Sequence, residues 1–141
     1  MILEHLNYAA VAVSAVAYFM VGSIWFTPIG FSKPWMKGHG IVMPDDATAQ
    51  AQMKKEMPKL FAMTFVLCFL AVLSVACIEG IARVNNCMAG AKVGLAAAVF
   101  AFVAIAQSHM YTRKSFKLVL IDAGYHIVSL VIVGIILAVW H

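Results

Sequence analysis

The fold is decided by the stretch LVLIDAGYHIVSLVIVGIILAVW, residues 118–140. A helix needs about 20 apolar residues to cross the hydrocarbon core of a bilayer. This stretch reaches that length, and Asp122 is its one formal charge. It therefore predicts a membrane-spanning helix that carries a single carboxylate.

The composition of the whole chain agrees with a membrane protein. The 141 residues are 64% hydrophobic and 11% charged, whereas a soluble domain is about 45–50% apolar and about 25% charged. So few charges cannot cover a water-facing surface. The composition excludes a disordered chain and a secreted disulfide scaffold. No basic stripe with interleaved aromatic residues indicates nucleic-acid binding.

Three more segments N-terminal to residues 118–140 have the length and apolarity of membrane spans. We predict one transmembrane domain over residues 1–141, with spans at about 6–26, 59–82, 89–110 and 118–140. A linker occupies about 27–58, and its second half is predicted to form a short helix lying at the membrane surface. Pro58 suits the first turn of the second span. The fold class is thus all-α, an antiparallel up-down four-helix bundle with a short interfacial helix.

The basic residues predict the orientation. One set lies in the first and third loops: Lys33, Lys37, Lys54, Lys55, Lys59, Arg113, Lys114 and Lys117. On the opposite side lie Arg83 and Lys92. Because cytoplasmic loops carry the excess of Lys and Arg, both termini are expected outside the cytoplasm, in a bacterial inner membrane. A homo-oligomer is expected, since small bundles often assemble further.

Two helix faces are predicted to point into the bundle. The third span has a stripe of small residues that favours close helix packing: Gly90, Gly94, Ala97, Ala101, Ala104 and Ser108. The first span has a polar and aromatic face, which includes Asn7, Ser14, Tyr18, Gly22 and Trp25. Glu79 and Lys92, near the outer ends of the second and third spans, could pair across the bundle, but they are expected to reach the interface.

The candidate site centres on Asp122 and His126, which share one face of the fourth span. A bare carboxylate at this depth must be protonated, hydrated or paired. His126 is its nearest candidate partner in sequence. Because helix ends meet at the cytoplasmic side, we expect a polar cluster of Tyr18, Trp25, His109, Asp122 and His126. The alternative is an internal hydrogen-bond network that fixes helix register.

Metal and cofactor sites are not predicted. The three cysteines contain no C-x-x-C pair, which argues against zinc. Met36, His39 and Met43 could bind copper(I), but their irregular spacing on a loop favours chance. The sequence contains no H-E-x-x-H, no phosphate-binding glycine loop and no G-x-S-x-G motif.

Two segments carry a family resemblance. The first comprises Asn7-Tyr8, then Gly22-Ser23-Ile24-Trp25-Phe26-Thr27-Pro28, then Phe31, Lys33, Pro34, Trp35 and Met36. The second comprises Phe116-Lys117-Leu118 and Ile121-Asp122-Ala123-Gly124-Tyr125-His126. Together they resemble the small bacterial four-span membrane-protein family called domain of unknown function seventeen sixty-one. The resemblance implies the architecture but no activity, and its motifs include Trp25, Asp122, Tyr125 and His126.

Three functions remain open. The leading hypothesis is binding or transport of a small solute, ion or proton. Its candidate residues are Asp122, His126, Tyr125, His109, Trp25, Tyr18 and Asn7. The second is a membrane-embedded enzyme that acts on a lipid or quinone-like substrate, with His126 as acid and base. The third is a structural or assembly subunit. The expected partners are the lipid bilayer, further copies of the chain and a small-molecule or lipid ligand.

Overall fold

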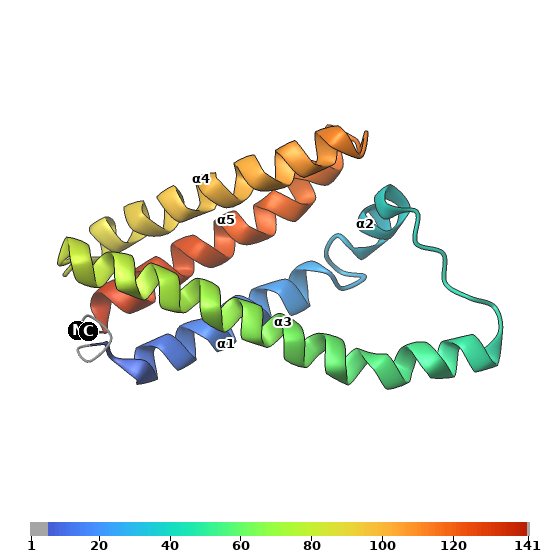
Figure 1. Ribbon diagram of the computed structural model, residues 1–141, viewed down its shortest axis with the longest axis horizontal. Helices are drawn as coiled ribbons and strands as arrows, with labels where there is room; N and C mark the ends of the chain where they lie inside the picture. The colour runs from blue at the N-terminus through green and yellow to red at the C-terminus, as the bar shows by residue number, and fades with distance from the viewer. Residues whose placement is uncertain (1–5, 141) are drawn as a thin grey trace.

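The computed structural model describes residues 6–140, and that part of the chain forms five helices (Figure 1). These are α1 (Tyr8–Trp25), α2 (Ser32–His39), α3 (Ala47–Ala82), α4 (Cys87–Tyr111) and α5 (Phe116–Val139). All but α2 are long and apolar enough to cross a membrane. The four predicted spans are confirmed, and the ends of the predicted 1–141 domain lie outside the described residues.

Polar residues in the loops determine where the helices begin. Each span starts behind a side chain that accepts a hydrogen bond from a free backbone N–H of its first turn. These capping residues are Asn7, Asp46, Asn86 and Ser115. The short loop before α4 also holds Arg83, which closes α3 in the left-handed conformation with φ of 52°. Caps of this kind fix the span boundaries from local sequence.

Successive spans run in opposite directions, as the up-down topology requires (Figure 1). We call the end that holds α2 and the α4–α5 loop the linker end. The other end is the terminal end, where Asn7 Nδ2 at the start of α1 donates a hydrogen bond to Trp140 O after α5, at 3.3 Å. The antiparallel four-helix arrangement is confirmed.

The break predicted at Pro58 is wrong. α3 is one helix of 36 residues, and Pro58 lies inside it. A proline removes one i→i−4 hydrogen bond and crowds one carbonyl. Good helix formers outweigh this cost on both sides of Pro58: residues 47–57 are rich in alanine, glutamine, methionine, lysine and glutamate, and residues 59–63 are KLFAM. The short separate helix is α2, earlier in the linker than the sequence indicated.

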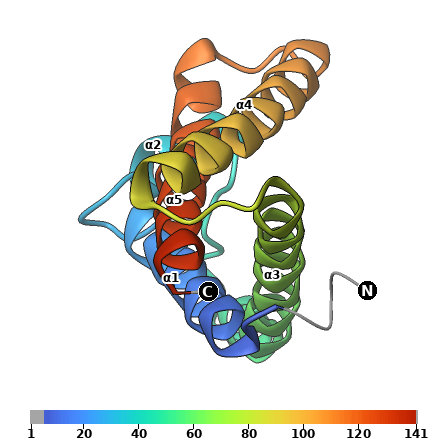
Figure 2. The same cartoon turned by 90° about the vertical axis from the view of Figure 1, so that its left-hand side faces the viewer.

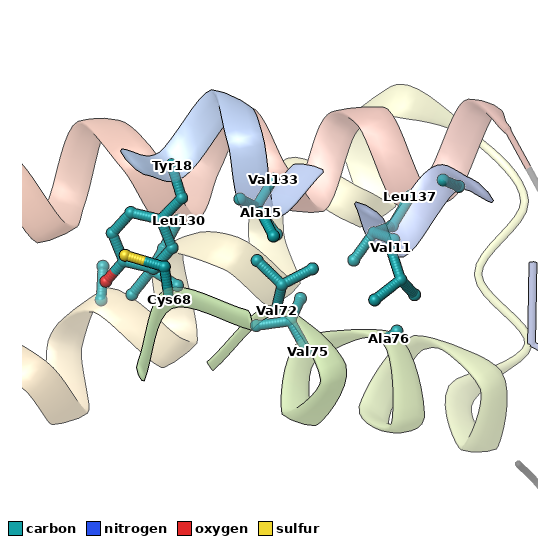
Figure 3. Close-up of a cluster of buried hydrophobic side chains, with 12 residues drawn as sticks. Val11, Ala15, Tyr18, Cys68, Val72, Val75, Ala76, Leu130, Val133 and Leu137 are labelled. Carbon is teal, nitrogen blue, oxygen red and sulfur yellow. The ribbon is translucent and has the colours of Figure 1, made fainter. Parts of the chain in front are cut away.

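The core lies between α1, α3 and α5 (Figure 3). Its best-buried side chains include Val11 and Ala15 from α1, Val72 from α3 and Val133 from α5, each at most 1% exposed. Tyr18 lies in the same core at 3% exposure. The predicted inward face of the first span is therefore confirmed for Tyr18, whose ring packs against helix neighbours rather than lipid.

α4 packs on α5 through glycines, as the stripe of small residues predicts (Figure 2). A Cβ on Gly94 would lie 2.1 Å from Leu130 O, and one on Gly134 would lie 2.2 Å from Gly90 O. No side chain fits at these distances. We call the contact of Gly90, Gly94 and Gly134 the glycine seam, and it lies in the terminal half of the bundle.

Candidate functional site

Asp122 is the centre of a polar cluster at the linker end. Its Oδ1 accepts a hydrogen bond from Trp35 Nε1 at 2.7 Å. Its Oδ2 lies 2.8 Å from His109 Nε2 and 3.2 Å from His39 Nε2. The Asp122 side chain is 15% exposed, and that of His109 is 12% exposed. We call these four residues the Asp122 cluster. Its members come from α2, α4 and α5.

The turn before α2 brings Trp35 and His39 to the bundle. After α1 ends, the chain folds back so that Phe31 N donates to Trp25 O at 2.8 Å. A Cβ on Gly30 would lie 2.3 Å from Trp25 O, so glycine permits this close approach. The Trp35 ring then packs on Phe26, with ring centroids 5.3 Å apart. The turn thus places one face of α2 over the end of α5.

The far end of α2 is fastened to the α4–α5 loop. Gly40 ends the helix in the left-handed conformation, with φ of 71°. Lys114 Nζ donates to Gly38 O at 3.2 Å. A basic group near the last carbonyls of a helix satisfies them and complements the helix dipole. These contacts hold His39, the last residue of α2, beside Asp122.

The hydrogen bonds of His109 define its tautomer. Its Nδ1 lies 2.9 Å from Ile105 O, and a carbonyl oxygen can only accept, so Nδ1 carries a proton. In the neutral ring Nε2 then has a lone pair and no proton. That lone pair faces Asp122 Oδ2 at 2.8 Å. Two lone pairs at this distance repel, so the contact requires a proton or another cation between the two atoms.

His126 belongs to a second group, one turn deeper. The hydroxyl of Tyr18 and Nδ1 of His126 share a hydrogen bond of 2.5 Å. Tyr125 packs beside them, with its ring centroid 5.4 Å from that of Tyr18, and its hydroxyl lies 3.7 Å from Cys68 Sγ. Asp122 and His126 share a helix face, but the hydrogen bonds of Asp122 go to α2 and α4. The expected Asp122–His126 pair is replaced by Tyr18–His126.

Trp25 and Asn7 bond to backbone carbonyls rather than to Asp122. Trp25 Nε1 donates to Ile121 O at 3.0 Å, and its ring covers Gly124, where a Cβ would lie 3.0 Å from the indole. Trp25 therefore joins α1 to α5 next to the Asp122 cluster. Asn7 caps α1 at the terminal end, far along the bundle from Asp122. Both contacts connect helix ends.

Two members of the cluster were missed from sequence. Trp35 stood only in the family motif, and His39 only in a Met/His group attributed to chance. Both belong to the linker, and no helical spacing relates them to Asp122. Together His39, His109 and Asp122 offer three metal-type ligand atoms that lie within 4.8 Å of one another. Sequence spacing did not indicate metal ligands because each comes from a different helix.

A second carboxylate inside the bundle lies at the terminal end, and this one is buried. Glu79 is 5% exposed, so the interfacial position predicted for it is wrong. It lines a pocket of about 120 Å³ between α1, α3 and α5, together with Val11, Arg83 and Trp140. Among the described residues, three buried side-chain oxygens have no hydrogen-bond partner: Ser14 Oγ, Glu79 Oε1 and Ser129 Oγ. Unpartnered polar atoms thus continue from mid-bundle to the terminal end.

These features define a four-span helical membrane protein with ionisable groups inside the bundle. The family model described as "Protein of unknown function (DUF1761)" matches residues 9–138, and the chain belongs to this family. The resemblance drawn from the sequence is confirmed. No curated protein and no solved structure matches the chain. The family carries no assigned activity, so function has to be argued from the site.

Proposed function

We propose that this protein binds a small cation or proton at Asp122 and moves it across the membrane. The observation that carries the proposal is the Asp122 cluster. An ionisable side chain on a membrane span is costly and is kept for function. Asp122 is the one formal charge between residues 118 and 140, and α2 and α4 each bring a histidine to it.

Polar side chains deeper in the bundle support movement beyond the cluster. His126 and Ser129 follow Asp122 on α5 by four and seven residues, about 6 and 10 Å along the axis at 1.5 Å per residue. Ser14 precedes Tyr18 by one turn of α1. Among the described residues, the buried hydroxyls of Ser14 and Ser129 lack hydrogen-bond partners. A buried polar group without a partner favours water or a passing ion beside it. Glu79 would receive the cation at the terminal end.

The enzyme hypothesis is less well supported. It assigned His126 as acid and base, oriented by Asp122. His126 bonds to Tyr18 instead, so the carboxylate does not hold its ring. The assembly hypothesis explains the glycine seam, but it gives no reason for a carboxylate and two histidines to meet inside the membrane. Transport accounts for the groups at both ends.

The proposal includes the setting of the protein. The linker end carries most of the basic residues and is placed in the cytoplasm of a bacterial inner membrane, with both termini outside. A homo-oligomer is part of the proposal as well, because one bundle of four helices encloses little space. A small-molecule or lipid ligand would bind at the linker end.

The test uses the full chain in liposomes that contain a pH-sensitive or metal-sensitive dye. Wild-type protein should produce a cation- or proton-dependent signal above that of empty vesicles. Asp122→Asn keeps the shape of the side chain and removes its charge, so it should reduce the signal to the empty-vesicle level. Lys92→Gln, an exposed charge on α4, is the matched control and should transport like the wild type.

Two results would contradict the proposal. Wild-type vesicles that give no more signal than empty ones with either dye would exclude transport of a proton or metal. An Asp122→Asn protein that transports at the wild-type rate would exclude Asp122 as the binding charge. Gel filtration in detergent confirms that each variant is folded before reconstitution.

A further inference from the structure

We propose that His39, His109 and Asp122 form a binding site for a divalent transition-metal ion such as Zn²⁺. The inference deepens the proposed function, on which it rests for the role of the ion, by naming the class of cation. The binding itself is argued from the ligand atoms alone.

The three ligand atoms already have the spacing of a metal site. Asp122 Oδ2 lies 2.8 Å from His109 Nε2 and 3.2 Å from His39 Nε2, and all three atoms lie within 4.8 Å of one another. Zinc binds nitrogen and oxygen at about 2.0–2.1 Å in a tetrahedron, so its ligand atoms are about 3.3 Å apart. To bring the three ligand atoms to about 3.3 Å from one another, the side chains would have to move by well under ~2 Å. Such movements would close the site around one ion.

The ring of His109 is oriented as a metal ligand needs. Nδ1 donates to Ile105 O, and so Nε2 presents its lone pair to the centre of the cluster. A metal-binding histidine characteristically donates its other N–H to a carbonyl or carboxylate, which fixes the tautomer and the ring orientation. A cation between Nε2 and Asp122 Oδ2 would turn two repelling lone pairs into two coordinate bonds.

The other oxygen of Asp122 is held in the same way. Trp35 Nε1 donates to Oδ1 at 2.7 Å, which leaves Oδ2 for the ion. Outer partners of this kind orient the ligands and contribute to affinity. The Trp35 ring also contacts the ring of His39, with centroids 4.8 Å apart. Trp35 therefore positions two of the three ligands.

The ligand types select the class of metal. Imidazole ligands suit Zn²⁺, Fe²⁺, Ni²⁺ and Cu²⁺, whereas Mg²⁺ and Ca²⁺ prefer sites made of oxygen. Three protein ligands leave one coordination position open, unlike the closed four-ligand sites that retain structural zinc. Water would fill the open position. His39 comes from α2 and the other ligands from spans, so binding also joins the linker to the bundle.

The experiment measures metal binding to the full chain in detergent by equilibrium dialysis with Zn²⁺ and with Co²⁺. Wild-type protein should bind one ion per chain, and bound Co²⁺ should show the visible absorption of a site with nitrogen ligands. His39→Ala and His109→Ala should each weaken Zn²⁺ binding at least tenfold. Trp35→Phe should weaken it about tenfold, as loss of an outer partner does. His126→Gln, a half-buried histidine outside the cluster, should leave Zn²⁺ affinity unchanged.

Equal Zn²⁺ affinity in the wild type and in His39→Ala would overturn the inference, as would wild-type binding no stronger than that of the His39→Ala/His109→Ala double variant. His39 lies on α2, outside the spans, so its variant keeps the test valid if His109→Ala does not fold. Metal binding without flux would leave this inference standing and remove the transport proposal. Proton flux without metal binding would do the reverse.

Discussion

The two halves of the bundle are built differently. At the linker end, side chains join the helices: Trp35 donates to Asp122, and Phe26 packs on the ring of Trp35. At the terminal end, α4 and α5 touch through Gly90 and Gly134, where a Cβ would lie 2.2 Å from a backbone oxygen. Small residues let backbones approach in lipid, where no hydrophobic drive brings helices together. The terminal half holds the helices, and the linker half holds a site.

The carboxylates of Asp122 and Glu79 show the same contrast. Asp122 has hydrogen-bonding partners on both oxygens, whereas Glu79 Oε1, among the described residues, has none. A carboxylate with several donors is fixed in place, and one without a partner keeps the cost of its lost hydration. The side chain of Asp122 is thus held in place by its neighbours, whereas Glu79 faces a pocket of about 120 Å³.

Substitution of Asp122 should destabilise the protein far more than substitution of Glu79. Asp122→Ala should lower the free energy of unfolding by about 3 kcal/mol, because it leaves the indole N–H of Trp35 without its acceptor and removes the carboxylate that both histidines contact. Glu79→Gln should leave stability unchanged or raise it, since it removes a charge that has no partner. Thermal unfolding in detergent measures both. Equal losses for the two variants would remove the contrast between the ends.

The glycine seam gives the next effect. Gly94→Val places a side chain where a Cβ alone would lie 2.1 Å from Leu130 O. α4 and α5 must move apart, and we expect a loss of about 2 kcal/mol from overpacking. The matched control is Ala96→Val on the exposed face of α4, which should unfold at the wild-type temperature. If both variants unfold alike, the seam does not hold the helices together.

The smallest effect concerns the second polar group. Tyr18→Phe removes the hydroxyl bonded to His126 and should cost about 1 kcal/mol, the usual net value of one hydrogen bond. Tyr125→Phe removes a weaker contact with Cys68, 3.7 Å long, and should cost less. Denaturation in detergent compares the two. A larger loss for Tyr125→Phe would mean that the Tyr18–His126 bond contributes little.

Local sequence predicted the spans well, because apolar length and polar caps are local properties. Three of the four predicted spans begin and end within two residues of the boundaries of α1, α4 and α5. The exception was the start of α3, where Pro58 was expected to begin the helix. One missing backbone hydrogen bond was outweighed by good helix formers on both sides. Proline marks a boundary only where its neighbours also favour one.

The sequence predicted Asp122 as the centre of the candidate site, but it did not predict that His39 and Trp35 would contact it. Asp122 stood out because it is a lone charge in an apolar run, and that is readable from sequence. His39 and Trp35 contact it across 83 and 87 residues of chain. Helical periodicity relates residues only within one helix, so it favoured His126, which shares the face of Asp122. Contacts between helices depend on the fold of the linker.

We propose that Asp122 binds the transported cation, and a recording of charge movement across a supported membrane is the decisive experiment. A jump in proton or Zn²⁺ concentration should evoke a current from wild-type proteoliposomes, because binding moves charge into the bundle. Asp122→Asn should give no current above that of protein-free membranes. A current of wild-type size from Asp122→Asn would contradict the account.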